Sequence, residues 1–388
     1  MTAVHETAYP RMRSSLTDTE LQALYTPPPD DLAFMEHSTK STVAAFGGLL
    51  LLKTFQRLGY FLAFDDVPPR LLRHLATATG VLLPHDCLQQ YEQRGFRKWH
   101  LPLIRHYLGI TALSDGGRRV VVGALLEASR SQDILADIIN VGIEALVQAR
   151  DELPAFSMLR RAAQKARAQI NHGYYHQVDA TLDDVQRAMI QRLLSQGDQV
   201  GSSPWQRLKR EPKRPTTKQI REHLAHVRWL QSLHTARHAL DGIPETKLQR
   251  FADEARALDI ARMQEAQAAK RLTLAVTFIR VRTAQALDDL AEMCIRLMHK
   301  FHHKAKEALD DYRDQHQEQT EALISLLSQL VSGWQQSATA EARLRTIGAV
   351  LGEDVDPIRE RCEAYLAYAG NNYLPFLLPL VRPHRKLL

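Results

Sequence analysis

Basic side chains gather in one stretch of the sequence, residues 200 to 238. Nine Lys or Arg stand there against two acids, namely Arg207, Lys209, Arg210, Lys213, Arg214, Lys218, Arg221, Arg228 and Arg237 against Glu211 and Glu222. The stretch carries +7, so the other residues contribute −1 to the net charge of +6. Such a patch neutralises a polyanion, and nucleic acid is the commonest partner of this kind. A solvated cationic linker has the same composition, so charge alone leaves both interpretations open.

The order of the residues favours DNA binding within this stretch. Thr216 or Thr217 can cap a helix, on which Lys218, Arg221 and Arg228 lie on or near one face. The arm before that helix carries Lys209, Arg210, Lys213 and Arg214. An extended basic arm followed by a basic helix is a recurrent way to cover the phosphate backbone and enter a groove.

A second basic segment follows a pair of expected helices between residues 67 and 110. A helix over residues 69 to 78 is followed by a turn at Gly80 and a second short helix, and Ala76 precedes Gly80 as in a helix-turn-helix. Asp86 departs from that motif, which has an apolar residue there. The candidate DNA-binding side chains of this segment are Arg97, Lys98, His100 and Arg105. A similar cluster is not rare on an ordinary protein surface.

Motifs for catalysis are missing. The sequence has no phosphate-binding glycine loop, no G-x-S-x-G elbow and no H-E-x-x-H. Glu222, His223 and His226 reverse the zincin order, and a second histidine group at residues 299 to 303 lies among lysines that would repel a cation. Acid pairs such as Asp288-Asp289 are most simply a solvated helix face. We therefore predict no catalytic residue, no metal site and no cofactor.

The elements that must position the basic residues are expected to be helices. Residues 16 to 24 begin with a capping box of Thr17 and Glu20, and a helix over residues 43 to 58 ends at Gly59. The only β-like fragment, residues 120 to 122, is too short to found a sheet. The sequence predicts an all-α, multi-domain helical protein with helix-turn-helix-like DNA-binding modules.

One long stretch lacks helix breakers. No Gly or Pro occurs from Glu245 to Ser332, which is 88 residues, and apolar residues recur three and four apart from about residue 272 to 330. This pattern predicts either one long helix or a helical hairpin folded around Asp310 to Gln319. The periodicity is the same in both.

The domain boundary is expected where Gly, Ser and Pro mix with basic residues. We predict an N-terminal helical DNA-binding domain over residues 1–197, a basic linker over 198–215, and a second helical domain with the long helix over 216–388. The longest apolar run has ten residues, well short of the roughly 20 that cross a bilayer. The N-terminus lacks the apolar region of a secretory signal, and three distant cysteines suit a reducing compartment. We therefore expect a cytoplasmic protein without a membrane partner.

Several segments, in order, resemble the N-terminal region of the Tn-three family (class II) replicative transposases. They are LTDTELQALYTPPPDDLAFM, GGLLLLKTFQRLGYF, VPPRLLRHLATATG, YEQRGFRKWHLPLIRHYLGI, PTTKQIREHLAHVRWLQSL, ALISLLSQLVSGW and YLPFLLPLVRPHRKLL. In the fourth, the family pattern R-x-x-H-L-x-x-I-x-x-x-L-G falls on Arg97, His100, Leu101, Ile104, Leu108 and Gly109. Each piece is moderately specific, and the similarity runs along nearly the whole chain.

The resemblance implies end recognition rather than chemistry. The family's three catalytic carboxylates lie in a later RNase H-like domain, and we expect this chain to end before that domain begins. It implies sequence-specific binding to the terminal inverted repeats of a transposon, in DNA transposition and recombination by a bacterial, nucleoid-associated protein. Double-stranded DNA is then the partner, with a second copy or a catalytic transposase chain as protein partner. A fragment, a split transposase or a decayed copy would each have this sequence.

The alternative function is a non-catalytic helical scaffold or regulatory protein derived from a transposase. The salt dependence of DNA binding separates the two, because phosphate neutralisation gives a steep dependence that scaffolding does not. An enzyme active by itself is disfavoured by the missing motifs.

Overall fold

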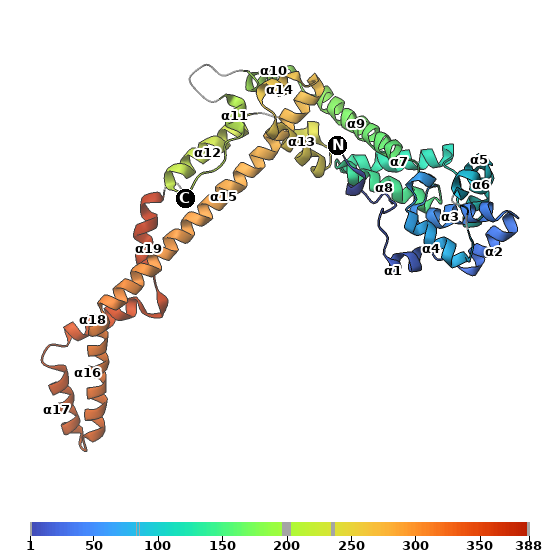
Figure 1. Ribbon diagram of the computed structural model, residues 1–388. Helices are drawn as coiled ribbons and strands as arrows, with labels where there is room; N and C mark the ends of the chain where they lie inside the picture. Colours follow the sequence, from blue (N-terminus) through green and yellow to red (C-terminus); the bar gives the residue numbers. More distant parts are fainter. Residues whose placement is uncertain (1, 83, 85, 196–202, 234–236, 386–388) are drawn as a thin grey trace. The chain divides into compact units, whose positions relative to one another are not determined.

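The computed structural model describes residues 2–82, 84, 86–195, 203–233 and 237–385 (Figure 1). Within these ranges the chain is helical and forms no β-strand, and one isolated parallel bridge joins Thr111 and Asp151. The all-α prediction is confirmed. Residues 120 to 122, which look β-like in the sequence, lie inside a helix. In the same ranges no helix is both long and apolar enough to cross a membrane.

The chain folds into two compact units that alternate along the sequence. The first comprises Met1–Leu194 and Ala236–Phe278, and the second Ser195–Thr235 and Ile279–Leu388. The domain boundaries expected from the sequence stay predictions, and residues 198 to 202 of the expected linker lie outside the described residues. Each unit is considered separately below.

The first unit is built from short and medium helices. They are α1 (Asp18–Glu20), α2 (Pro29–Ser38), α3 (Thr42–Leu58), α4 (Pro69–Thr79), α5 (Cys87–Gln93), α6 (Phe96–Leu108), α7 (Asp115–Ser131), α8 (Leu135–Gln148), α9 (Phe156–Thr181), α10 (Asp184–Leu193), α13 (Glu245–Ala257) and α14 (Ile260–Glu265). The longest helix, α15 (Ala268–Gln315), begins here and continues into the second unit.

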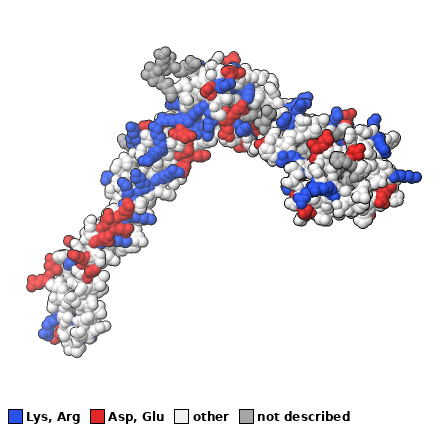
Figure 2. Space-filling view, viewed as in Figure 1, with Lys and Arg blue, Asp and Glu red and all other residues white. Residues whose placement is uncertain are grey.

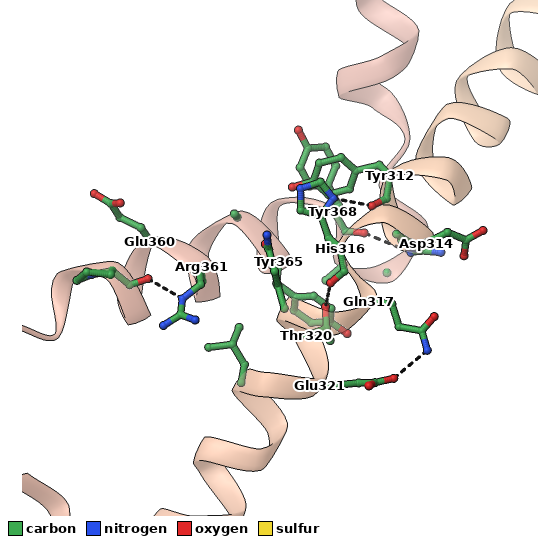
Figure 3. Close-up of a pocket in the computed structure, with 17 residues that line it drawn as sticks. Tyr312, Asp314, His316, Gln317, Thr320, Glu321, Glu360, Arg361, Tyr365 and Tyr368 are labelled. Atoms are coloured by element: carbon green, nitrogen blue, oxygen red, sulfur yellow. Dashed lines mark hydrogen bonds between the residues drawn. The ribbon is translucent and has the colours of Figure 1, made fainter. Parts of the chain in front are cut away.

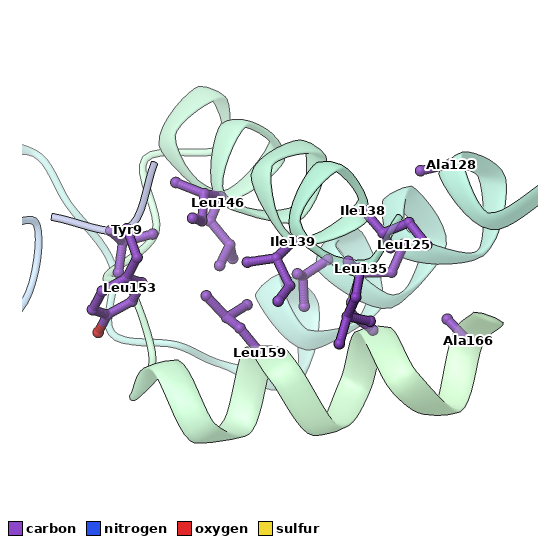
Figure 4. Close-up of a cluster of buried hydrophobic side chains, with 13 residues drawn as sticks. Tyr9, Leu125, Ala128, Leu135, Ile138, Ile139, Leu146, Leu153, Leu159 and Ala166 are labelled. Atoms are coloured by element: carbon purple, nitrogen blue, oxygen red, sulfur yellow. The ribbon is translucent and has the colours of Figure 1, made fainter. Parts of the chain in front are cut away.

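Clusters of apolar side chains hold the first unit together. Helices α7, α8 and α9 bury Leu125, Ile138, Ile139 and Leu159 against one another (Figure 4). Helix α3 is buried over most of its length between α2, α4, α5 and α6, and its residues 49 to 52 are almost completely buried. A helix enclosed in this way fixes the positions of its neighbours, including the basic helix α6.

Local signals in the sequence set the ends of these helices. The capping box of Thr17 and Glu20 is present, and Gly59, Gly80 and Gly109 end α3, α4 and α6 with φ between 64° and 71°. The predicted capping box and the predicted helix ends at these glycines are therefore confirmed. Of the predicted helix-turn-helix, only the glycine after the first helix is found. Helix α4 ends at Thr79 and α5 begins at Cys87, so the connection between them is longer than the three- to four-residue turn of that motif.

The second unit is arranged along α15 (Figure 1). Its other helices are α11 (Pro204–Leu208), α12 (Thr217–Ser232), α16 (Gln317–Gln336), α17 (Ala340–Leu351), α18 (Asp356–Ala367) and α19 (Leu374–Val381). Helices α12 and α19 pack on α15 around Ile220, Met293, Leu297 and Leu377. The core of this unit is therefore a narrow apolar strip along one helix.

The long stretch without Gly or Pro resolves as a long helix. Helix α15 runs for 48 residues to Gln315. The helical hydrogen bonding is interrupted at His316, and α16 begins at the next residue. The acidic segment from Asp310 onward is helical and does not fold the chain back. The hairpin of this region forms later, where α16 packs against α17.

Candidate nucleic-acid interface

Helix α12 presents its cations because its opposite face is buried. The side chain of Thr216 caps the helix by accepting a hydrogen bond from the amide of Gln219 at 3.3 Å. On the inner face, Nε2 of His223 lies 2.9 Å from the carbonyl oxygen of Ala286 on α15. The outer face carries Lys218, Arg221 and Arg228, and all three are exposed. The predicted basic face is therefore directed to solvent.

A buried arginine orders the backbone at the start of the basic arm. Arg282 on α15 is 6% exposed, and its guanidinium donates to the carbonyl oxygens of Leu208 at 3.2 Å and Arg210 at 2.7 Å. Nearby, the guanidinium of Arg207 lies 4.1 Å from the ring centroid of Trp229 on α12. These contacts fix the path of the chain from α11 toward α12.

Not every predicted cation of the second unit is free to bind a phosphate. Arg210 forms an ion pair with Glu222 at 3.0 Å, and the ammonium group of Lys209 lies 5.8 Å from the ring centroid of Trp205. The remaining predicted cations are exposed and form no ion pair with an acid of the described residues: Lys213, Arg214, Lys218, Arg221 and Arg228. We call these five the cationic face.

Two lysines that were not predicted as DNA-binding residues lie beside the cationic face. Lys300 and Lys304 of α15 line a cavity of about 390 Å³ together with Thr216 and Thr217 at the first turn of α12. A helix N-terminus carries unsatisfied amide donors and a partial positive charge, so it attracts anions, and the two ammonium groups add to this field. Their spacing of four along a helix is a signal in the sequence, but only the packing of α12 on α15 brings them to this place.

Charge in the second unit changes sign along α15. Residues 307 to 321 contain six acids, namely Glu307, Asp310, Asp311, Asp314, Glu318 and Glu321, against Arg313. Figure 2 shows blue side chains over α12 and the adjoining part of α15, and red ones near the C-terminal end of α15. A phosphate backbone is therefore attracted to the α12 side and repelled from the far end of α15.

The predicted basic residues of α6 are largely engaged within the first unit. Arg97 forms an ion pair with Glu92 at 3.2 Å and donates to the carbonyl oxygen of Leu62 at 2.9 Å. Arg105 pairs with Glu152 at 2.8 Å. These two arginines hold α6 against its neighbours.

His100 and Lys98 differ in exposure although they are near neighbours in α6. His100 is 3% exposed, its Nδ1 lies 2.7 Å from the hydroxyl oxygen of Tyr91, and burial lowers its pKa. Lys98 is exposed, and the adjacent Trp99 is 75% exposed. Of the four residues predicted in this segment, Lys98 is the one whose charged group reaches solvent without an ion pair among the described residues.

The histidine patterns noted in the sequence do not assemble a ligand set. His223 binds a carbonyl, Glu222 pairs with Arg210, and His226 is 2% exposed with no hydrogen bond to either ring nitrogen. Burial, followed by the charges of His223 and the nearby arginines, lowers the pKa of His226 to about 4. Within the described ranges, no group of three or more His, Cys, Asp or Glu side chains is placed to hold a metal ion.

A cavity of the second unit, about 700 Å³, lies where α15, α16 and α18 meet (Figure 3). Tyr312, Tyr365 and Tyr368 line it together with the carboxylates of Asp314 and Glu360. The guanidinium of a further lining residue, Arg313, donates to carbonyl and amide oxygens of its own unit. The lining carries the carboxylates of Asp314, Glu321 and Glu360 against the guanidinium groups of Arg313 and Arg361, so it is acidic on balance and does not suit a phosphate.

Comparison with known proteins gives a family match and several relatives. Residues 1–166 match a family model described as "Domain of unknown function (DUF4158)". The chain is 24% identical over 229 residues to the transposase for transposon Tn501 of Pseudomonas aeruginosa, covering 58% of this chain and 23% of that protein. It is similar to the transposases for Tn3926 and Tn21 of Escherichia coli, at 24% and 23% identity over 68% of this chain and 26% of each relative.

These similarities support the predicted relationship of this chain to transposases of the Tn-three family. The chain spans about a quarter of the length of the curated relatives it matches. An alignment of 268 residues is longer than either unit alone, so the similar region includes part of each unit.

Proposed function

Starting from this relationship, we propose that the protein binds double-stranded DNA at the terminal inverted repeats of a transposon and serves as the end-recognition part of a transposase. It would act on DNA in the bacterial cytoplasm, associated with the nucleoid. The observation that carries the proposal is the cationic face, whose five Lys and Arg side chains are exposed without an acidic partner among the described residues.

Lys300 and Lys304 extend this interface. With the first turn of α12 they form a place for one phosphate, while Lys218 and Arg221 reach the next phosphates along the same helix. Contacts to phosphates fix the position of a protein on the duplex, and contacts to base edges supply sequence preference. The planar guanidinium groups of Arg221 and Arg228 suit guanine edges.

In the first unit, we assign DNA contact to Lys98 and a supporting role to the other predicted residues. Arg97, His100 and Arg105 hold α6 through Glu92, Tyr91 and Glu152 and so position Lys98. Trp99 offers an exposed aromatic surface beside it. This assignment supports a second, smaller contact to the duplex.

Strand transfer is assigned to a catalytic transposase chain or domain that works with the described units. That chemistry needs carboxylates converging on a metal pair about 4 Å apart. The acids of α15 are instead arranged in pairs at helical spacing, such as Glu292 with Arg296 and Glu307 with His303. Incubated with magnesium and transposon-end DNA, the chain is expected to bind without nicking or joining strands.

Selection from a randomised duplex library, followed by fluorescence anisotropy of the enriched duplex, tests the proposal. Lys218→Gln with Arg221→Gln is expected to lower the affinity and to flatten the slope of log K against log salt by about 1.8, at roughly 0.9 per phosphate contact. The control, Arg345→Gln with Arg359→Gln, removes the same charge elsewhere in the second unit and is expected to leave the slope unchanged. Salt-independent binding, or an equal effect in both variants, would instead favour the helical scaffold.

A further inference from the structure

Helix α9 is buried on one face and exposed on the other. Its inner face carries Leu159, Ala163 and Ala166, which belong to the apolar cluster shared with α7 and α8 (Figure 4). The opposite face is exposed, and its residues follow one another at helical spacing: Arg161, Gln164, Lys165, Ala168, Gln169 and His172. We call these six residues the α9 stripe.

The charge around the α9 stripe is positive. From Leu153 to Val178 the sequence has no Asp or Glu and four Lys or Arg. Arg161 and Lys165 are exposed, and neither forms an ion pair with an acid of the described residues. The acid of α9 itself, Asp179, lies near the C-terminal end of the helix and is paired with Arg187 at 2.5 Å. The stripe therefore attracts a polyanion.

The stripe also carries side chains of the types that read base edges. Arginine pairs with O6 and N7 of guanine, glutamine pairs with N6 and N7 of adenine, and alanine can contact the methyl group of thymine. Arg161, Gln164, Ala168 and Gln169 supply these three types on one face. The stripe has no apolar side chain larger than alanine, so it lacks the aliphatic and aromatic anchors of a protein interface. Its composition favours DNA over a protein as its partner.

Helix α9 differs in this respect from α6, the helix that was predicted to bind DNA in the first unit. Arg97 and Arg105 of α6 pair with Glu92 and Glu152. The two cations of the α9 stripe are instead directed to solvent. Helix α9 therefore offers a longer basic surface than the exposed Lys98 of α6.

The dimensions of the α9 stripe suit the major groove. That groove of B-DNA is about 12 Å wide and admits an α-helix. From Arg161 to His172 the stripe is about 17 Å long at 1.5 Å per residue, which equals about five base pairs at roughly 3.4 Å each. We propose that α9 is the recognition helix of the first unit and reads base edges through Arg161, Gln164 and Gln169, an assignment that rests on the proposed binding to transposon ends.

Parallel selections from a randomised duplex library test the two glutamines in the full chain. Gln164→Ala with Gln169→Ala leaves the charge unchanged, and alanine is the better helix former, so folding and phosphate contacts are retained. This variant is expected to lose the base preference at one or two positions of the wild-type site and to bind that site about tenfold more weakly. The slope of log K against log salt is expected to stay the same. The control, Gln148→Ala with Gln191→Ala, alters exposed glutamines of α8 and α10 and is expected to select the wild-type site.

Methylation of guanine in the selected site tests Arg161. A methyl group on N7 blocks a bidentate arginine in the major groove. Arg161→Ala is expected to become insensitive to methylation of one guanine at which the wild-type chain loses affinity. Arg118→Ala removes an exposed arginine of α7 and is expected to keep the wild-type methylation pattern.

The possible outcomes separate the role of α9 from the proposed function. If the wild-type chain enriches a site and both α9 variants keep its sequence, affinity and methylation pattern, end recognition stands and the role of α9 is refuted. If the glutamine variant selects the wild-type site and Arg161→Ala changes only the salt slope, the stripe holds phosphates and reads no base, which also contradicts the proposal. A wild-type chain that enriches no sequence refutes the proposed function itself.

Discussion

Nη2 of Arg282 lies 2.7 Å from the carbonyl oxygen of Arg210, so one arginine of the long helix holds the backbone of another arginine at the start of the basic arm. The same guanidinium also binds the carbonyl of Leu208. A cation in the interior of the second unit therefore orders the chain that carries the cationic face. Because lysine offers one ammonium group in place of a planar fork, it cannot reproduce both contacts with the same geometry.

Replacing Arg282 is expected to destabilise the second unit. Arg282→Ala leaves two inward-facing carbonyls without a donor, which costs about 2 to 4 kcal/mol of unfolding free energy. Urea denaturation measures the loss. The comparison variant Arg296→Ala removes an exposed pair with Glu292 and is expected to cost less than about 1 kcal/mol. Equal losses in the two variants would refute a structural role for Arg282.

Neutralising Lys300 and Lys304 is expected to weaken DNA binding, although these lysines were not predicted from the sequence as DNA-binding residues. Lys300→Gln with Lys304→Gln removes two charges beside the first turn of α12. The salt slope measured by anisotropy is expected to fall by about 1.8, from roughly 0.9 per phosphate contact. If the slope matches that of the wild type, the cavity at the start of α12 holds no phosphate.

The stability of the second unit is expected to fall as the pH is lowered from about 6.5 toward 4. The pKa of His226 is lowered from 6.5 to about 4 when the chain is folded, so between these values the unfolded chain binds more protons than the folded one. Acid therefore favours unfolding, by at most about 3 kcal/mol from this residue.

Urea midpoints at pH 7 and pH 5 test the role of His226. His226→Leu is expected to reduce the difference between the two midpoints, because it removes the group that titrates. His303→Leu replaces an exposed histidine and is expected to keep the wild-type difference. An unchanged difference in His226→Leu would assign the pH dependence to other groups.

Two glycines inside helices are expected to respond oppositely to alanine. A Cβ at Gly47 in α3 would collide with the ring of the buried Tyr91, whereas one at Gly123 in α7 meets no atom within 4 Å. Gly47→Ala is expected to cost about 1 to 3 kcal/mol through overpacking. Gly123→Ala is expected to add about 0.5 to 1 kcal/mol, because alanine is the better helix former. Thermal denaturation shows both, and a stabilised Gly47→Ala would contradict the packing of Tyr91.

Much of the local structure could be predicted from the sequence. The capping box at Thr17, the left-handed residue Gly59 at the end of α3 and the cap of α12 at Thr216 depend on atoms within about four residues, so the residue types there are sufficient. The exposure of Lys218, Arg221 and Arg228 follows from the same helical period. The all-α class follows from these signals together.

Only the tertiary structure decided which predicted cations remain available for DNA and how the stretch without Gly or Pro is arranged. The sequence marks Arg97, His100 and Arg105 as surface cations, but their partners Glu92, Tyr91 and Glu152 depend on the turn after α5 and on the packing of distant segments. A long helix and a hairpin share one apolar period, so periodicity cannot separate them. In the structure α15 stays one helix to Gln315, and the hairpin forms between α16 and α17. Local signals determine where helices begin and end, and long-range packing determines which side chain meets which partner.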